Sequence, residues 1–88
     1  MKVDFKKSFL RDLKRIKEAR VKERLREIVE TIENAKCLQD IGNLDKLKYG
    51  DHYYRIRIGD YRLGLILEDD TVILVRFLHR KDLYRYFP

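Results

Sequence analysis

The sequence predicts an α+β protein in which an N-terminal helix hairpin packs on one face of an antiparallel meander sheet. Apolar residues recur at helical spacing in the first part of the chain, and the period changes to two from Tyr53 onward. Short turn signals then divide the second half into three strands. A chain of 88 residues can bury one hydrophobic core but not two, so we expect one domain over residues 1–88.

Two amphipathic helices are expected after a short opening strand at residues 2–4. The first helix is indicated by Phe5, Phe9, Leu13 and Ile16, with Ser8 or Asp4 available as its N-cap. The second is indicated by Val21, Leu25, Ile28, Val29 and Ile32, with Asn34 near its end. A few residues join the helices, so they form a hairpin with one apolar stripe.

The second half of the chain reads as sheet. Residues around Gly42 and Gly50 are predicted to be loop and turn. Strands are expected at 53–58, 61–68 and 71–78, because the dipeptides at 59–60 and 69–70 suit two-residue hairpin turns. Residues 81–87 are expected to form a short C-terminal helix or an irregular tail.

The charge balance favours a polyanionic partner. Lys and Arg number 21 against 15 Asp and Glu, a formal net charge of +6, although such a charge can also serve solubility alone. A hydrophobic content of 44% excludes a disordered tail. No apolar stretch approaches the roughly 20 residues that span a bilayer, so we expect a cytoplasmic protein. Cys37 has no second thiol to pair with and makes a poor metal ligand, so we expect it to be a half-buried apolar residue. We expect no cofactor.

Alternation across the predicted hairpins separates two faces of the sheet. The first is apolar and should receive the helix hairpin: Ile56, Ile58, Leu63, Leu65, Leu67, Val72, Leu74 and Leu78. The second is part cationic and part apolar: Arg55, Arg57, Arg62, Gly64, Ile66, Ile73, Val75, Phe77 and His79. Arg76 is an exception, because its parity places it among the leucines. One explanation is that Arg76 lies near the sheet edge and its guanidinium group reaches water. The other is that the register slips by one residue in the last strand, which moves His79 to the other face.

The cationic face calls for an anion. Arg57 and Arg62 are expected side by side across the hairpin, and like charges in that position destabilise a sheet. An acidic neighbour such as Asp60, Asp82 or a glutamate can neutralise them, or an anionic ligand such as phosphate can bind there.

Two runs of residues resemble the RelE/ParE toxin superfamily, and the resemblance covers the whole chain. Residues 54–63 read Tyr-Arg-Ile-Arg-Ile-Gly-Asp-Tyr-Arg-Leu, and residues 79–84 read His-Arg-Lys-Asp-Leu-Tyr. The resemblance implies a single RelE-like toxin domain of a type II toxin–antitoxin system. It further implies an mRNA interferase, an endoribonuclease that cuts mRNA in the ribosomal A site and so inhibits translation, held inactive by a small RelB-like antitoxin.

The same resemblance implies roles for residues of the cationic face. Cleavage without a metal needs the substrate 2′-OH to attack the adjacent phosphate, with a base, an acid and cations to assist. The implied catalytic residues are Arg62 on the scissile phosphate, Arg57 beside it, His79 as acid or base, and Tyr84 in base stacking or proton transfer. Arg55, Arg80 and Lys81 are implied phosphate contacts. No acidic residue can be placed on this face as the base. His79 can instead be hydrogen-bonded at a strand end, and Tyr84 can simply pack the last helix.

Other functions and one protein contact remain open from the sequence. A ParE-like inhibitor of DNA gyrase would share the fold, and a non-catalytic nucleic-acid-binding module would share the basic face. Ile66, Ile73, Val75 and Phe77 are expected on the cationic face with no segment of the chain to cover them. We expect an acidic, partly disordered antitoxin to fold onto these four residues.

Overall fold

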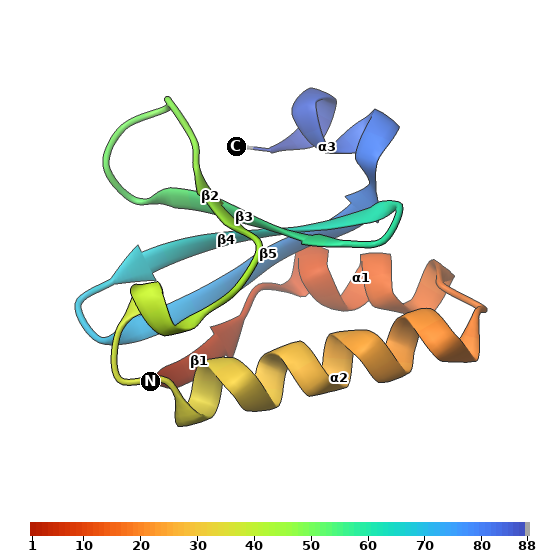
Figure 1. The fold of residues 1–88 in the computed structure, drawn as a ribbon. Coiled ribbons are helices and arrows are strands. Elements are labelled where there is room, and N and C mark those ends of the chain that lie inside the picture. The colour runs from red at the N-terminus through yellow and green to blue at the C-terminus, as the bar shows by residue number, and fades with distance from the viewer. Residues whose placement is uncertain (88) are drawn as a thin grey trace.

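The computed structural model describes residues 1–87 and contains a five-stranded mixed sheet (Figure 1). Its strands are β1 (Lys2–Phe5), β2 (Leu44–Lys46), β3 (Tyr53–Ile58), β4 (Tyr61–Glu68) and β5 (Thr71–His79). The spatial order is β1-β5-β4-β3-β2, with β1 parallel to β5 and every other pair antiparallel. The helices are α1 (Lys7–Arg15), α2 (Ala19–Asn34) and α3 (Arg80–Tyr86), with a 3₁₀ turn at Leu38–Asp40.

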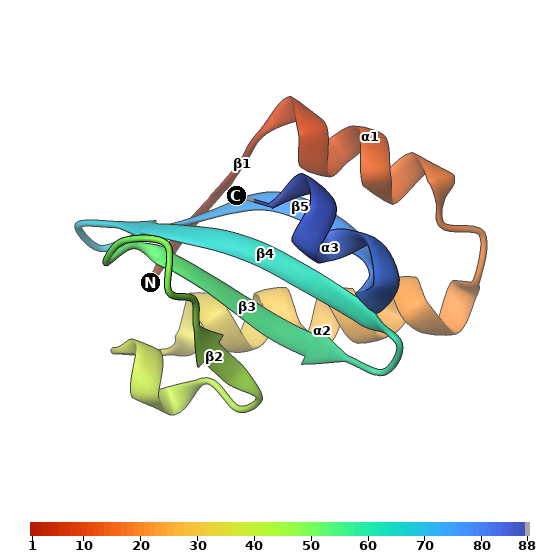
Figure 2. The same cartoon turned by 90° about the horizontal axis from the view of Figure 1, so that it is seen from above.

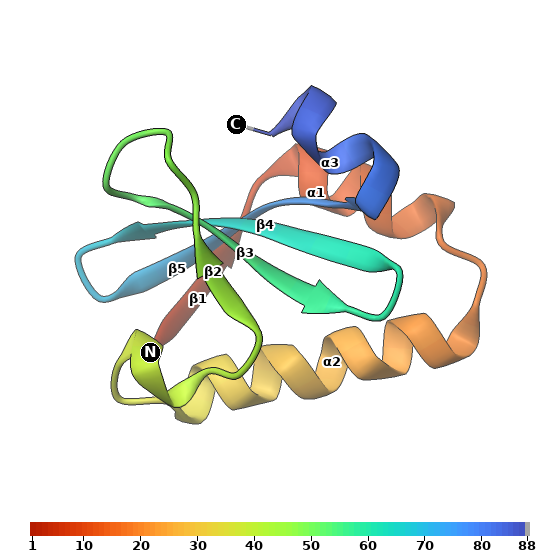
Figure 3. The same ribbon diagram turned by 45° about the horizontal axis from the view of Figure 1, so that its top comes forward.

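Helices cover both faces of this sheet unequally. The long helix α2 lies under one face, whereas α3 and the loop between β2 and β3 rise from the other (Figures 1 and 3). Helix α1 runs beside β5, past the end of the short strand β1 (Figure 2). The main core lies between the sheet and the α1–α2 hairpin and contains Phe9, Ile16, Leu25, Ile32, Ile56, Ile58, Leu63, Leu65, Val72, Leu74 and Phe77. The predicted α+β class and the packing of the hairpin are therefore confirmed.

The predicted N-cap of the first helix is wrong. Helix α1 begins after Lys6, and no side chain caps it. The Ser8 hydroxyl instead donates a hydrogen bond to the carbonyl oxygen of Val75, at 2.6 Å. The Asp4 carboxylate accepts a hydrogen bond from the backbone N–H of its neighbour Phe5. Ser8 thus ties α1 to β5, a contact between distant parts of the chain that local capping rules do not anticipate.

A β-bulge in β5 changes the predicted faces. Gly64 pairs with Arg76, but the next residue of β4, Leu65, pairs with Leu74, so Val75 is an extra residue in β5. Every side chain of β5 after the bulge therefore lies on the face opposite to the predicted one. The placement of Phe77 and His79 on the cationic face was wrong, as was that of Leu78 on the apolar face. The alternative of a one-residue slip in the last strand, which moves His79 to the other face, is confirmed.

A second, smaller core lies on the α3 side of the sheet. It consists of the buried residues Leu47, Leu83 and Phe87, with Tyr53, Val75 and Leu78 packed against it. The rings of Tyr53 and Phe87 meet edge to face, with centroids 5.7 Å apart. The C-terminal segment thus packs against Val75, one of the apolar residues expected to be uncovered.

Gly64 makes this second core possible, and its replacement tests the packing. A Cβ at position 64 would lie 2.8 Å from Cδ2 of Phe87, closer than carbon atoms approach without displacement. We expect Gly64→Ala to lower the free energy of unfolding by about 1–3 kcal/mol, because overpacking forces the ring away. Gly42→Ala is the matched control, since nothing lies within 4 Å of its added Cβ. Equal denaturant midpoints for the two variants would contradict the prediction.

Asp12 fixes the edge of β5 beyond the end of β1. Its carboxylate, on the buried face of α1, accepts hydrogen bonds from Arg76 Nε at 2.7 Å, from Arg76 Nη2 at 3.0 Å and from the backbone N–H of Phe77 at 2.9 Å. The Arg76 guanidinium also lies 5.3 Å from the ring centroid of Tyr86 in α3. Arg76 therefore joins α1, β5 and α3. These contacts explain why a charged residue stands where alternation predicted an apolar one.

Local expectations between α2 and β3 need two corrections. Cys37 is exposed rather than half-buried. Residues 44–46, for which no strand was predicted, form the edge strand β2, in which Asp45 pairs with Arg55. Within residues 1–87 no helix combines the length and apolar composition needed to cross a bilayer.

Candidate functional site

Arg57 and Arg62 are direct cross-strand partners in β3 and β4, as the hairpin register predicts. Arg55 lies two residues before Arg57 and therefore on the same face of the sheet. This face is the one that α3 partly covers, opposite to the main core. We call Arg55, Arg57 and Arg62, together with Arg80 at the start of α3, the arginine cluster.

Arg62 lies at the centre of the arginine cluster. Partial burial, followed by the positive charges of Arg55, Arg57 and Arg80, lowers its pKa. Its Nη1 donates hydrogen bonds to the carbonyl oxygens of Gly59 at 2.7 Å and Tyr61 at 2.8 Å. An arginine remains protonated near neutral pH even when its pKa falls. The fold therefore holds a guanidinium among like charges, where an anion would bind favourably.

Asp45 is the acidic residue that the sequence analysis did not place on this face. Its Oδ2 lies 3.3 Å from Nε of Arg55 and 3.6 Å from Nε of Arg57. The expected neutralising groups, Asp60 and Asp82, take part in no ion pair with the cluster in the described part of the chain, although the charge of Asp60 partly opposes the fall in the pKa of Arg62. Within residues 1–87 Arg62 itself forms no ion pair with a carboxylate. Asp45 therefore neutralises part of the cluster and leaves Arg62 available to an anion.

Helix α3 brings the C-terminal residues to the same face. Tyr84 is 58% exposed, and the Arg55 guanidinium carbon lies 5.1 Å from the centroid of its ring. Leu83, the preceding residue, is fully buried in the second core and so fixes the rotation of the helix. The backbone N–H of Arg80 donates a hydrogen bond to the Asp60 carbonyl oxygen at 2.8 Å, beside the turn that precedes Arg62. Lys81 is exposed in the first turn of the helix.

His79 lies apart from the arginine cluster. It is the cross-strand partner of Tyr61, so its ring is on the side of the helix hairpin, with ring centroids 5.8 Å apart. Its Nδ1 accepts the backbone N–H of Lys81 and so caps α3. Burial and the nearby Glu18 carboxylate raise the pKa of Tyr61, the cross-strand neighbour of His79. The alternative of a hydrogen-bonded strand-end histidine matches this geometry.

The four residues expected to bind an antitoxin are not an open surface. Phe77 is 1% exposed within the main core, and Ile73 is 8% exposed. Val75 packs against the second core, and Ile66, the partner of Ile73 across the strands, is only partly exposed. The expected exposure was wrong for Phe77, which the bulge turns inward, and for Ile73, which is buried. Contact of Ile66 and Val75 with an antitoxin stays a prediction.

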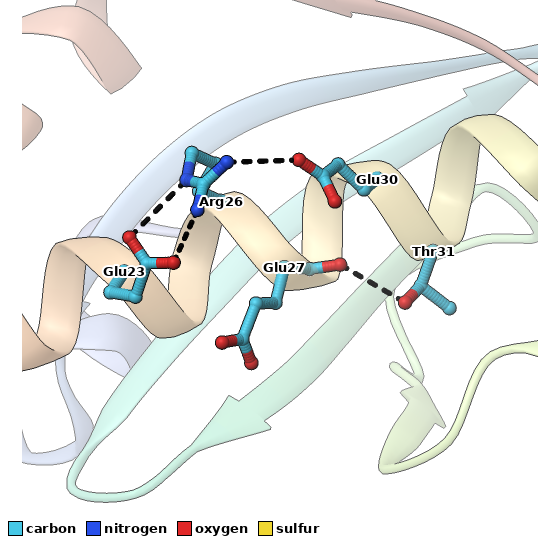
Figure 4. Close-up of polar contacts among 5 residues, drawn as sticks. All are labelled: Glu23, Arg26, Glu27, Glu30 and Thr31. Atoms are coloured by element: carbon cyan, nitrogen blue, oxygen red, sulfur yellow. Dashed lines mark hydrogen bonds and ion pairs between the residues drawn. The ribbon is translucent and has the colours of Figure 1, made fainter.

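The exposed charges of α2 contrast with the arginine cluster. Arg26 forms ion pairs with Glu23 and Glu30 one turn to either side, and the Thr31 hydroxyl donates to the Glu27 carbonyl oxygen (Figure 4). The hydrogen bond from Arg26 lowers the pKa of Glu23. The charge of Arg26 is therefore balanced locally, whereas the charge of the arginine cluster is balanced only in part, by Asp45.

The geometry assembles the elements of a phosphate site. Cations from β3 and from α3 surround Arg62, and a carboxylate lies within ion-pair distance of two of them. An exposed tyrosine borders the cluster. Such a site can hold a phosphate and accept a proton from a neighbouring hydroxyl group.

Comparison with known proteins agrees with this fold and with the resemblance. Residues 3–84 match the family described as ParE toxin of the type II toxin–antitoxin system parDE. The chain is 43% identical over 89 residues to toxin RelE3 of Methanocaldococcus jannaschii, with all of both chains covered. It matches the RelB–RelE antitoxin–toxin complex from Methanococcus jannaschii with a TM-score of 0.82 and 39% identity, covering 97% of this chain and 99% of the other. The YoeB dimer from Staphylococcus aureus, 20% identical with a TM-score of 0.74 and coverage of 91% and 97%, supports the fold alone. Together with the sequence runs on β3, β4 and α3, these matches show that the chain belongs to the RelE/ParE superfamily of type II toxin–antitoxin toxins.

Proposed function

We propose that this toxin is a cytoplasmic endoribonuclease that cleaves mRNA in the ribosomal A site and thereby inhibits translation. The observation that carries the proposal is the pairing of Arg57 with Arg62 across the hairpin, with the carboxylate of Asp45 3.6 Å from Arg57. An RNA-cleaving site needs cations for the phosphate and a proton acceptor beside them. A protein that only docks on phosphates has no use for the carboxylate.

The proposed reaction uses residues of one face. Arg62 and Arg57 hold the scissile phosphate and stabilise the negative charge that grows on its oxygens. Asp45 accepts the proton of the 2′-OH as that oxygen attacks phosphorus, and the bond to the 5′ oxygen breaks. Tyr84 is the proposed proton donor to the leaving 5′ oxygen. Arg55, Arg80 and Lys81 contact neighbouring phosphates, and His79 caps α3 without a role in proton transfer.

Replacing Asp45 tests its proposed role as the base. We expect Asp45→Asn to lower the single-turnover cleavage rate by about 100-fold, because the amide cannot accept the proton. Binding of an uncleavable RNA should stay equal or tighten, since one negative charge is lost from the cationic face. Asp51→Asn is the matched control, because Asp51 is exposed and its ion pair with Lys46 is long, at 3.9 Å. An unchanged cleavage rate in Asp45→Asn would exclude Asp45 as the base.

The experiment that tests the function is expression of the toxin alone in cells, followed by mapping of new mRNA 5′ ends. We expect 5′ ends inside translated codons, absent from an Arg62→Ala culture. The match to the ParE family favours gyrase as the second candidate target. A gyrase inhibitor would instead produce DNA breaks and leave translated mRNA intact, so the same cultures distinguish the two.

A cognate RelB-like antitoxin is the proposed protein partner. The net charge of +6 favours an acidic segment. Exposed apolar surface lies at Phe5, which is 52% exposed, and Leu10, which is 38% exposed. Both border a groove of about 520 Å³ between β1, α1 and α2. We therefore place the apolar contact of the antitoxin at this groove rather than at Ile66, Ile73, Val75 and Phe77.

A further inference from the structure

A hollow of about 280 Å³ lies beside the arginine cluster, between the β2–β3 loop and α3. Its lining consists of Lys46, Leu47, Lys48, Tyr49, Arg55 and Tyr84. The loop and the helix rise from the same side of the sheet in Figure 1. The volume is near the lower end of the roughly 300–1,000 Å³ typical of small-ligand pockets, so it suits one small planar group.

The lining combines aromatic, apolar and cationic side chains. Tyr49 is 55% exposed, although a large aromatic side chain without a ligand is more favourably buried. Leu47, at the base, is 8% exposed and anchored in the second core. Lys48 takes part in no ion pair within residues 1–87, whereas Lys46 is paired with Asp51 and Arg55 with Asp45. A nucleobase with its attached phosphate has the flat face and the negative charge that such a lining receives.

The loop that carries Tyr49 is closed by the backbone. The N–H of Leu47 donates to the Tyr53 carbonyl oxygen at 2.8 Å, and the N–H of Leu67 donates to the His52 carbonyl oxygen at 3.0 Å. Gly50 has a φ of 85°, a conformation that favours glycine, directly after Tyr49. Because the loop is held at its base, less conformational entropy is lost when a ligand contacts Tyr49.

We propose that this hollow binds an unpaired base of single-stranded RNA, stacked on Tyr49, with Lys48 on the adjoining phosphate. The inference rests on the proposed function, because it assigns a base subsite to the RNA whose scissile phosphate lies on Arg62. Arg55 connects the two, since it lines the hollow and belongs to the arginine cluster. Stacking tolerates every base, so the subsite adds affinity without strict sequence preference.

The test measures binding of a short 2′-O-methyl RNA to the intact toxin by fluorescence anisotropy. This probe has no free 2′-OH and cannot be cleaved. We expect Tyr49→Ala to weaken binding about tenfold, and Tyr49→Phe, which keeps the ring, to bind as the unsubstituted toxin does. An abasic deoxyribose-phosphate strand of the same length should bind both variants equally. Lys48→Ala should reduce the salt dependence of binding by about one released counterion, whereas Lys14→Ala on α1 should not.

The outcomes separate this inference from the proposed function. Unchanged RNA affinity in Tyr49→Ala, or an equal loss with the abasic strand, overturns the base subsite even if cells show cleaved mRNA. Loss of antitoxin binding alone in Tyr49→Ala would also overturn it, by making the hollow a protein contact. A tenfold effect of Tyr49 on RNA without any cleavage in cells would support the subsite and reject the nuclease. Melting curves control for folding, which an exposed loop residue should not affect.

Discussion

Arg62→Ala is expected to lower the rate of RNA cleavage by about 1,000-fold. Arg62, unlike Arg55 and Arg57, forms no ion pair with a carboxylate within residues 1–87, so its charge is available to the phosphate. That charge matters most when negative charge grows on the phosphate oxygens, which places the loss in the chemical step. Single-turnover cleavage at saturating toxin measures that step, and anisotropy with the uncleavable RNA should show a much smaller loss of affinity.

Stability provides a second signature for Arg62. Burial, followed by the positive charges of Arg55, Arg57 and Arg80, lowers the pKa of Arg62 in the folded protein, and the charge of Asp60 opposes this effect only in part. Removing it should therefore leave the melting temperature unchanged or raise it, despite the loss of two hydrogen bonds to backbone carbonyls. Arg62→Lys should recover only part of the rate, because an ammonium group cannot make the bidentate contact of a guanidinium.

Arg26→Ala is the matched control for Arg62. Arg26 is an exposed arginine already held by Glu23 and Glu30, so its removal should leave cleavage unchanged (Figure 4). A rate for Arg62→Ala within tenfold of the unsubstituted toxin would contradict the assignment. A large loss of rate accompanied by unfolding would show a structural role instead.

The sequence was most informative where short-range signals determine the structure. The predicted strands at 53–58 and 61–68 match β3 and β4 residue for residue, because Gly59 and Asp69 adopt the positive φ that two-residue hairpin turns require. The pairing of Arg57 with Arg62 follows directly from the first turn. The central pair of the arginine cluster was therefore predictable from one turn and its alternation.

The bulge at Val75 was not predictable from alternation alone. An extra residue in a strand is hard to detect in the hydrophobic pattern. The one sign of it here was Arg76, a charged residue at a position where alternation predicted an apolar one. Its partner, Asp12, lies 64 positions away in the sequence, so nothing local identified the pair. The positions of Phe77 and His79 were wrong for this reason.

The position of Asp45 beside the arginine cluster and the packing of the C-terminal segment on the sheet were not predicted, for different reasons. Strand β2 has three residues, too few for a period-two pattern to appear. Leu83 and Phe87 share one side of the last helical turn, but the sequence does not say which face of the sheet receives them. Each depends on contacts made only in the folded chain, which single-sequence patterns do not contain.

Asp12→Ala is expected to lower the free energy of unfolding by about 3–5 kcal/mol. The Asp12 side chain is 2% exposed and that of Arg76 is 21% exposed, so the substitution leaves a largely buried cation without its carboxylate. It also leaves the backbone N–H of Phe77 without an acceptor. For a domain of this size the melting temperature should fall by more than about 10 °C. Arg76 also stacks on Tyr86, so α3 and Tyr84 should lose order as well.

A double-mutant cycle separates the ion pair from the cavity that alanine leaves. Asp12→Leu combined with Arg76→Met should recover much of the stability that either change alone removes, because a buried pair can be replaced by apolar groups more favourably than it can be broken. Asp45→Ala is the matched control, since its ion pairs are partly exposed and should contribute no more than about 1 kcal/mol. If Asp12→Ala and Asp45→Ala melt at the same temperature, Asp12 does not hold the edge of β5, and α3 must be positioned by the second core alone.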